Sequence, residues 1–254
     1  MMNSIRRQNC HCSKSQLSLV ASFLVVIFLA GCSLSIGAIE SSADVPEATG
    51  WYTEVVTDGL IHPWSIAWLP NGSALITERP GRLRLLRDGR LEPTPIAGLP
   101  KVCTDCGQGG LMDVSLHPNF AENSFVYLTY ASGSADSNRT TLARGRLDGM
   151  RLTDVEVIFE NANVKSGGQH FGSRLVWLPD NSLLMSIGDG GNPPISFAGD
   201  LIRKQAQQLS THFGKVVRLH DDGTGSPRQS FRGTARCKTG DLQLWSPQYP
   251  GHGL

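Results

Sequence analysis

The chain has 254 residues, of which 40% are hydrophobic and 18% are charged, and its formal net charge is +1. This length and composition suit one large domain with a hydrophobic core and exclude a disordered chain. Because the charge is close to zero and no basic stretch stands out beyond the extreme N-terminus, a nucleic-acid partner is also excluded. A small molecule or another protein is the expected partner.

The first 50 residues have the features of a secretion signal followed by a linker. Basic residues precede an apolar run, residues 17–30, which is too short to cross a membrane comfortably. The run ends in Leu-Ala-Gly-Cys and resembles the lipobox of bacterial lipoproteins, which predicts a signal peptide over 1–31 and lipidation of Cys32. Ser33 follows instead of an Asp, so we expect anchoring to the outer membrane on the periplasmic side, with residues 32–50 as a tether. An ordinary signal peptide with an incidental cysteine is the alternative.

From Trp51 onward the pattern is that of short antiparallel β-strands. Apolar runs of strand length are separated by Asn-Gly, Pro-Gly and Asp-Gly, which supply the positive φ that tight hairpin turns need. The first three strands are predicted at Ser65–Leu69, Ala74–Glu78 and Arg82–Leu86. A later strand is predicted at Lys215–Leu219.

A single Cys-x-x-Cys pair follows the first group of strands. Cys103 and Cys106 stand in an expected extracytoplasmic chain, where such a pair is more often a local disulfide than a redox centre. No histidine follows Cys106 and no second pair completes a zinc site, so neither covalent haem nor zinc is supported. Free thiols or redox activity remain the alternative to a disulfide.

The order of strands and turns repeats along the chain. Each unit has an apolar strand, a turn that contains Pro, a second apolar strand and a basic strand that ends in Gly, at spacings of roughly 50 to 65 residues. Such units, with about four strands each, are typical of the blades of a β-propeller. The loops beside the inner strands of successive blades meet at one mouth, where a functional site is expected.

Three polar residues lie beside the predicted inner strands, in glycine-rich turns. They are Gln108, His170 and Asp189. His170 and Asp189 flank the two strands of one hairpin, so they are expected to touch. A carboxylate bonded to one imidazole nitrogen fixes the tautomer and raises the basicity of the other nitrogen, as in a general base. Taken alone, each of these residues is more often a plain turn residue than a site residue.

The segments "GQGGLMDVSLHPNF", "HFGSRLVWLPDNSLLMSIGDGGN" and "FGKVVRLHDDGT" resemble the soluble sugar dehydrogenases that depend on pyrroloquinoline quinone (PQQ), the glucose/sorbosone dehydrogenase-like family. The resemblance implies an all-β, six-bladed β-propeller, of which residues 51–224 would form the N-terminal three to four blades. It implies PQQ and calcium as cofactors and an aldose sugar as substrate. It also implies that His170 is the base that takes the proton of the C1 hydroxyl, that Asp189 orients it, and that Gln108 contacts sugar and quinone. No metal ligand is assigned, and the electron acceptor is not indicated.

The C-terminal stretch lacks the quinone-binding segment that the family carries after "FGKVVRLHDDGT". Back-translated with permitted codons and read one base later, residues 238–254 give Tyr-Gly-His-Arg-Asn-Ile-Gln-Gly, and residues 225–232 give Asp-Asn-Pro-Phe. Both are expected family segments, in the expected order. We therefore predict a one-base frameshift near Gly225, with residues 225–254 out of frame and the fragment inactive.

Three functional hypotheses remain. The first is a lipid-anchored periplasmic dehydrogenase that oxidises the C1 hydroxyl of aldoses to lactones by hydride transfer to PQQ. The second is a β-propeller binding module without catalysis. The third, a calcium-dependent lactonase, fits poorly because the clustered Glu and Asn ligands of such sites are missing.

Overall fold

The computed structural model describes Gly50 and residues 52–225. The chain divides into two units, residues 1–53 and 54–254, and all the described strands lie in the second unit. The predicted signal peptide with Cys32, the tether up to residue 49 and the tail from residue 226 lie outside the described residues. No helix in the described part is long and apolar enough to span a bilayer.

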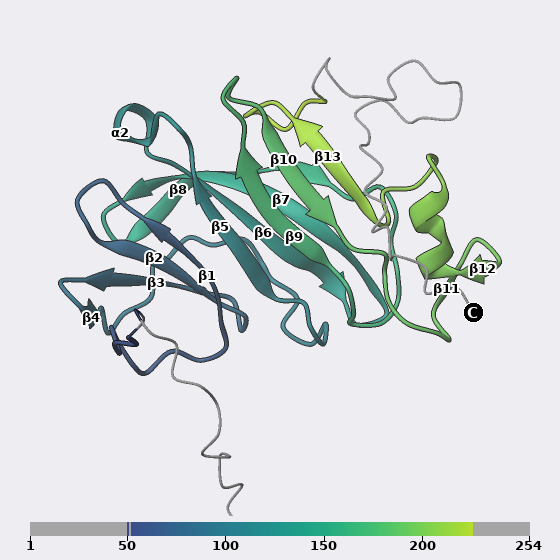
Figure 1. Ribbon diagram of the computed structural model, residues 1–254, viewed down its shortest axis with the longest axis horizontal. Coiled ribbons are helices and arrows are strands. Elements are labelled where there is room, and N and C mark those ends of the chain that lie inside the picture. The colour runs from purple at the N-terminus through teal and green to yellow at the C-terminus, as the bar shows by residue number, and fades with distance from the viewer. Residues whose placement is uncertain (1–49, 51, 226–254) are drawn as a thin grey trace, which may run out of the picture. The chain divides into compact units, whose positions relative to one another are not determined.

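The first sheet is an antiparallel meander of four strands, in the order β1-β2-β3-β4 (Figure 1). Its second strand has the predicted bounds, and its first and third differ from the predicted ones by one or two residues. The glycines of its three turns have φ between +70° and +92°, as the turn dipeptides predict. The strands are β1 (Pro63–Trp68), β2 (Ala74–Glu78), β3 (Arg82–Arg87) and β4 (Arg90–Leu91).

The second sheet repeats this order with longer strands. A short helix, α2 (Phe120–Asn123), lies in the connection between its first two strands. The central strand pair, β6 and β7, is joined by a tight hairpin and pairs in register over ten residues of β6. The strands are β5 (Leu111–Leu116), β6 (Phe125–Ser134), β7 (Ser137–Asp148) and β8 (Arg151–Glu160).

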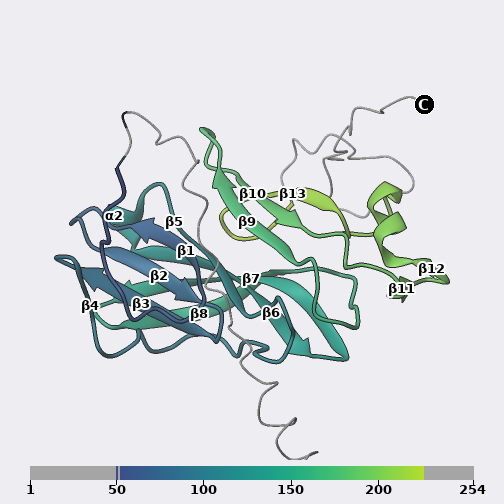
Figure 2. The same cartoon turned by 60° about the horizontal axis from the view of Figure 1, so that its bottom comes forward.

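The third sheet has three strands within the described residues, where the repeat predicts about four. A long excursion leaves the sheet after β10 and returns at β13, whose bounds are as predicted (Figure 2). The buried ammonium of Lys215 closes the excursion by donating to the carbonyls of Gln205, Ala206 and Phe213 at 2.7–3.0 Å. The strands are β9 (Gly172–Trp177), β10 (Leu183–Ile187) and β13 (Lys215–Leu219), and the excursion contains β11 (Ser196–Phe197), β12 (Asp200–Leu201) and the 3₁₀ helix η1 (Ile202–Gln207).

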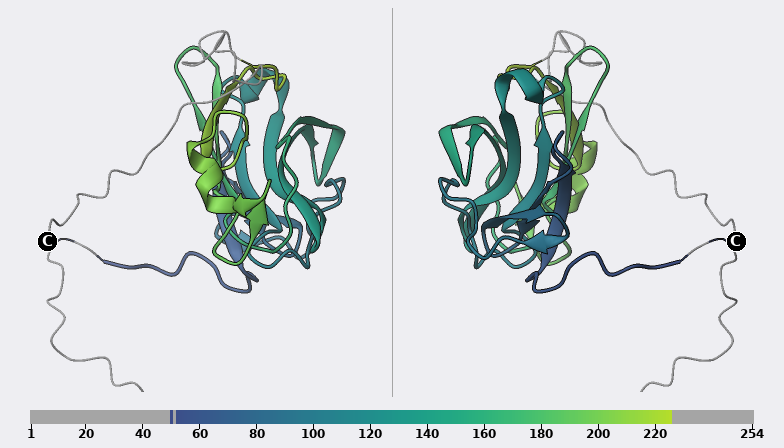
Figure 3. Two further views of the ribbon diagram at one scale, coloured as in Figure 1. Left: turned by 90° about the vertical axis from the view of Figure 1, so that its right-hand side faces the viewer. Right: turned by 90° about the vertical axis from the view of Figure 1, so that its left-hand side faces the viewer.

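The three sheets lie beside one another with their first strands, β1, β5 and β9, adjacent in that order. The two views of Figure 3 show the green strands of the third sheet beside the teal strands of the second. One apolar cluster, which includes Leu75, Leu111 and Leu128, joins the first sheet to the second. Another, which includes Leu142 and Met185, joins the second to the third. Burial of each such side chain contributes about 1.5–3 kcal/mol.

A β-bulge interrupts the pairing of each of the three first strands at the same end of the sheets. In the first sheet the Thr77 hydroxyl accepts the N–H of Ser65 at 3.0 Å and donates to the Met112 carbonyl of the next sheet at 2.5 Å. In the second sheet Thr129 likewise accepts an N–H from β5 and donates to the Ser173 carbonyl of the third sheet at 3.0 Å. These hydroxyls set the register between neighbouring sheets. The loops that precede β5 and β9 and follow β10 gather at this end, which we call the mouth.

Candidate active site

The β9–β10 hairpin brings two predicted site residues into contact at the mouth. The two strands pair antiparallel with Gly172 opposite Ile187, so the residues just outside the pairing, His170 and Asp189, face each other. His170 Nδ1 lies 2.6 Å from Asp189 Oδ1. The two side chains are 32% and 29% exposed, so they are open to solvent but not free to swing. The expected contact between the two residues is therefore present.

The hydrogen bonds fix which imidazole nitrogen is available for chemistry. An ionised carboxylate only accepts hydrogen bonds. Nδ1 of His170 therefore carries a proton, and this N–H donates a hydrogen bond to Asp189. The same Asp189 oxygen also accepts the N–H of Gly191 at 3.2 Å, which holds the carboxylate in place. Nε2 of His170 has no partner among the described residues. It is the nitrogen that can accept a proton from a ligand at the mouth.

Gln108 joins this pair from the neighbouring sheet. Its side-chain Oε1 accepts the main-chain N–H of His170 at 3.0 Å. The main-chain N–H of Gln108 donates to the Gly168 carbonyl at 2.7 Å. The two loops touch so closely that a Cβ at Gly168 would lie 2.7 Å from the Gly107 Cα. Because Oε1 is engaged, the side-chain NH₂ of Gln108 is oriented and has no acceptor in the described part of the chain. The structure thus brings all three predicted polar residues together.

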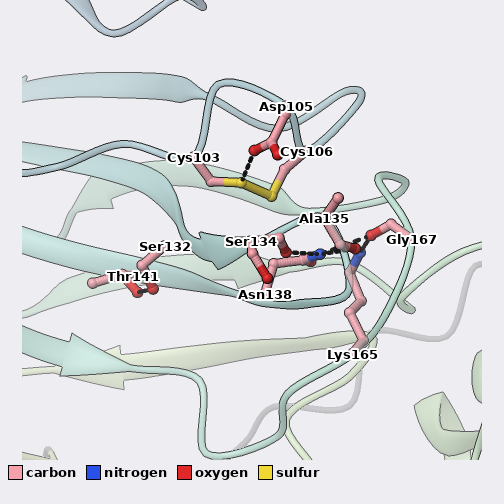
Figure 4. The surroundings of a disulfide bond; sticks show 10 residues. All are labelled: Cys103, Asp105, Cys106, Ser132, Ser134, Ala135, Asn138, Thr141, Lys165 and Gly167. Atoms are coloured by element: carbon pink, nitrogen blue, oxygen red, sulfur yellow. Dashed lines mark hydrogen bonds between the residues drawn. A yellow bond between two sulfur atoms is a disulfide. The ribbon is translucent and has the colours of Figure 1, made fainter.

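A disulfide between Cys103 and Cys106 closes the turn that leads to Gln108 (Figure 4). Both cysteines are buried, and Gly109 N–H donates to the Cys106 carbonyl. Arg79, at the end of β2, donates to the carbonyl of Gly107 at 2.8 Å. Sequence reasoning missed Arg79, because nothing in its local pattern shows that the first sheet reaches this turn.

Lys165 is a second mouth residue that sequence reasoning missed. Its ammonium donates to the Gly167 carbonyl at 2.8 Å and stands 4.1 Å from the centroid of the Phe171 ring, directly before β9. Figure 4 shows Lys165 and Asn138 converging on Gly167 near the disulfide. Burial lowers the pKa of Lys165 to about 8, because the charged ammonium is removed from water. No motif marks this lysine; only its position in the folded loop does.

A pocket of about 350 Å³ opens beside Asp189, between the third sheet and the excursion. Its lining is mostly apolar, with the carboxylate of Asp189 and the hydroxyl of Ser186 among the polar groups. The lining residues are Gly172, Ser186, Ile187, Gly188, Asp189, Ala206, Gly214, Lys215 and Val216.

The donors at the mouth suit an anionic cofactor that carries carbonyl groups. The oriented NH₂ of Gln108 and the guanidinium of Arg79, which lie beside one another through Gly107, are of the type that holds carboxylates and quinone oxygens. Calcium is not supported in the same way. Among the described residues, the one group of three metal-ligating side chains is Cys103, Asp105 and Cys106, whose sulfurs are joined in the disulfide. Calcium needs six to eight oxygen ligands, and this group of side chains does not supply them.

Comparison with known proteins decides the family. A profile of the family described as Glucose / Sorbosone dehydrogenase matches residues 60–247. The chain belongs to this family. The matched range continues past Gly225, and the frameshift predicted there stays a prediction.

Named relatives agree with this assignment. An uncharacterized protein of Synechocystis sp. is 55% identical over 198 residues, 75% of this chain and 47% of the relative. The aldose sugar dehydrogenase of Escherichia coli is 38% identical over 174 residues, 67% of this chain and 44% of the relative. The chain therefore spans less than half the length of these curated relatives.

A solved structure supports the fold. The PQQ-bound form of the aldose sugar dehydrogenase from Streptomyces coelicolor is 27% identical, with a TM-score of 0.57 over 71% of this chain and 51% of that one. The predicted all-β fold of the β-propeller family is confirmed. The three sheets are three blades of such a propeller, within the predicted three to four.

Proposed function

We propose that this site belongs to a quinoprotein dehydrogenase that oxidises the C1 hydroxyl of aldose sugars to lactones. Bound at the mouth, PQQ would supply the two-electron acceptor that takes the hydride from C1. The family, the relative named aldose sugar dehydrogenase and the PQQ-bound neighbour support the reaction class. The observation that carries the proposal is the contact of His170 Nδ1 with Asp189, which leaves Nε2 without a partner among the described residues.

Each residue has one role in this proposal. His170 accepts the proton of the sugar C1 hydroxyl at Nε2. Asp189 keeps the proton on Nδ1 and stabilises the imidazolium that forms, because a carboxylate 2.6 Å away offsets the new positive charge. Gln108 holds the His170 main chain and directs its NH₂ towards the cofactor and the sugar. Arg79 adds a positive charge behind the Gly107–Gln108 turn that favours an anionic cofactor.

We propose that the 254-residue chain holds the base but lacks the Arg-Asn quinone contacts expected in the shifted frame. Dye reduction should then be absent from this chain and should appear when the reading frame is restored. The two proteins are compared with PQQ, calcium and a panel of aldoses. Sequencing the coding DNA around Gly225 tests the frameshift separately, since codons that cannot give Arg-Asn in the shifted frame would exclude it.

The test of the catalytic assignment uses the frame-restored protein. His170→Asn should lower kcat by about 10²–10⁴, the usual contribution of a general base. His220→Asn serves as the matched control, because His220 is an exposed residue just after β13. Binding of PQQ without turnover of any aldose would instead favour the non-catalytic binding module.

We also propose that the protein is anchored in the outer membrane, on its periplasmic side, through Cys32. The lipobox-like sequence at residues 29–32 supports this. Cells fed a labelled fatty acid should label the wild-type protein and not Cys32→Ser. Equal labelling of both would contradict the anchor.

A further inference from the structure

The main chain that carries His170 into β9 has an unfavourable conformation. His170 has a φ of +50° and Ser173 a φ of +90°, and Gly172 between them has +75°. Residues other than glycine rarely adopt positive φ, and such strain persists only where the surroundings impose it. The strained segment, residues 170–173, must therefore be held from outside the hairpin.

The holding groups come from the second sheet. Thr140 donates its hydroxyl proton to the Phe171 carbonyl at 2.9 Å, and Thr129 donates to the Ser173 carbonyl at 3.0 Å. Both threonines are buried. Hydroxyl donors on two carbonyls of the strained segment, those of Phe171 and Ser173, restrict the rotation of the peptide groups that they hold.

Asp113 makes the strongest of these connections. Its side chain is 1% exposed and lies at the bulge of β5. Oδ2 accepts the N–H of Leu175 at 2.7 Å, and Oδ1 accepts from the Arg174 guanidinium at 3.1 Å, from the Ser65 hydroxyl at 2.5 Å and from the N–H of Val114 at 3.0 Å. One carboxylate thus links the first strands of all three sheets.

We propose that Asp113 is a positioning residue for His170. By fixing the start of β9 against β5, it keeps the His170 main chain within reach of Gln108, which lies directly ahead of β5. Thr129 and Thr140 share this role on the strained segment itself. The Asp113 carboxylate bonds to the Leu175 N–H and not to the His170 or Asp189 side chain, so its effect passes through the main chain from Leu175 back to His170.

The test is native-state hydrogen exchange of two main-chain amides in the 254-residue chain. The Leu175 amide reports the direct bond to Asp113, and the His170 amide reports the bond to Gln108. Asp113→Asn should speed exchange at His170 about tenfold or more relative to the amides of β2, since a buried acceptor is lost and an NH₂ group faces other donors. The ratio to β2 removes any general loss of stability.

A matched control comes from the opposite end of the same hairpin. Asp180, in the β9–β10 turn, also accepts from an arginine, a main-chain N–H and a hydroxyl. Asp180→Asn should leave the His170 ratio unchanged. An unchanged ratio in Asp113→Asn, or an equal rise in both variants, would overturn the proposal.

A second variant keeps the proposal testable where Asp113→Asn does not fold. Thr140→Val preserves shape and removes only the donor to Phe171, and it should raise the His170 ratio a few-fold; no change would overturn the proposal. The importance of this positioning for catalysis rests on the proposed function, in which His170 is the base. The exchange experiment needs neither sugar nor quinone, so its failure and a failure of the proposed function are distinguishable.

Discussion

Two histidines in this molecule each face a carboxylate, at opposite ends of the sheets, and they do so in different ways. At the mouth, His170 Nδ1 lies 2.6 Å from Asp189, the side chain is 32% exposed, and Nε2 has no partner among the described residues. At the far end, His117 is packed among aromatic rings, its Nδ1 accepts two N–H groups, and its Nε2 is 3.7 Å from Asp221. Burial lowers the pKa of His117, because the charged imidazolium is removed from water.

The difference shows what makes a histidine available for catalysis. Both rings have a fixed tautomer and an acidic neighbour. His170 leaves one nitrogen open to a ligand, whereas His117 uses Nδ1 as an acceptor inside the fold and covers the rest of its ring. Substitutions at the two ends should therefore change different quantities, catalysis at the mouth and stability at the far end.

Replacing each of the two histidines by Asn should give the largest contrast between the two ends, in kcat and in Tm. In the frame-restored protein, His170→Asn should lower kcat by about 10²–10⁴ with little change in Tm. His117→Asn should lower Tm with little change in kcat, because it leaves a cavity among packed rings and disturbs the bonds to Asn119 and Asn123. Steady-state kinetics and thermal melts of both variants test this; a fall of both quantities in both variants would remove the distinction.

Opening the disulfide should loosen the mouth. The double substitution of Cys103 and Cys106 by Ser removes a cross-link across a sequence separation of three. In the chain-entropy treatment, so short a loop corresponds to about 2 kcal/mol of stability. Urea unfolding of the double variant and of the wild type measures the loss. Identical midpoints would show that the link contributes nothing.

Lys165 should make the mouth more stable in alkali. Between about pH 8, its pKa in the fold, and the ordinary lysine value near 10.4, the unfolded chain binds more protons than the folded one. The free energy of unfolding therefore rises with pH in that window, by about 1–2 kcal/mol after allowance for residual hydration. Lys165→Met should flatten the rise in urea titrations from pH 7 to 10.

The upper limit of that pH range has a physical reason. Burial raises the pKa of Tyr127 and Tyr130 to about 12, so both favour the folded state less as pH rises above 10. Data above pH 10 would mix the two opposing trends. A slope in Lys165→Met equal to that of the wild type would contradict the assignment to Lys165.

The smallest effect should come from the far end in acid. Because the pKa of His117 is lowered in the fold, the unfolded chain binds the extra proton first as pH falls below about 6.5. The wild type should lose stability from pH 7 to pH 5 on this account, and His117→Gln should lose less. Urea unfolding at the two pH values gives the comparison, with His220→Gln expected to follow the wild type.

The sequence was sufficient for the repeat and for the three polar residues, because both depend on local pattern. Strand periodicity and turn dipeptides place β2 and β13 at their observed bounds. The glycine-rich turns point to His170 and Asp189, since a hairpin must bring its two ends together. Family resemblance supplied their roles.

The contacts that hold the site were not predictable in this way. Arg79, Asp113 and Lys165 reach the mouth from other sheets or from a loop, and no local period records which side chains meet across sheets. The excursion after β10 was missed for a related reason: its strands are two residues long, too short to show alternation. The tail and the lipobox lie outside the described residues.

The hydroxyl contacts between sheets also give the row of sheets a direction. Thr77 and Thr129 each accept from their own sheet and donate to the next one along the chain. Ser186 occupies the same place in the third sheet: it accepts the Arg174 N–H at 3.0 Å, and its proton has no acceptor among the described residues. The second sheet therefore accepts a hydroxyl hydrogen bond from the first sheet at one side and donates one to the third sheet at the other. Such a head-to-tail junction is heterologous, so it cannot pair with a copy of itself across a two-fold axis. Repeated from sheet to sheet, it forms a ring where the rotation between sheets closes.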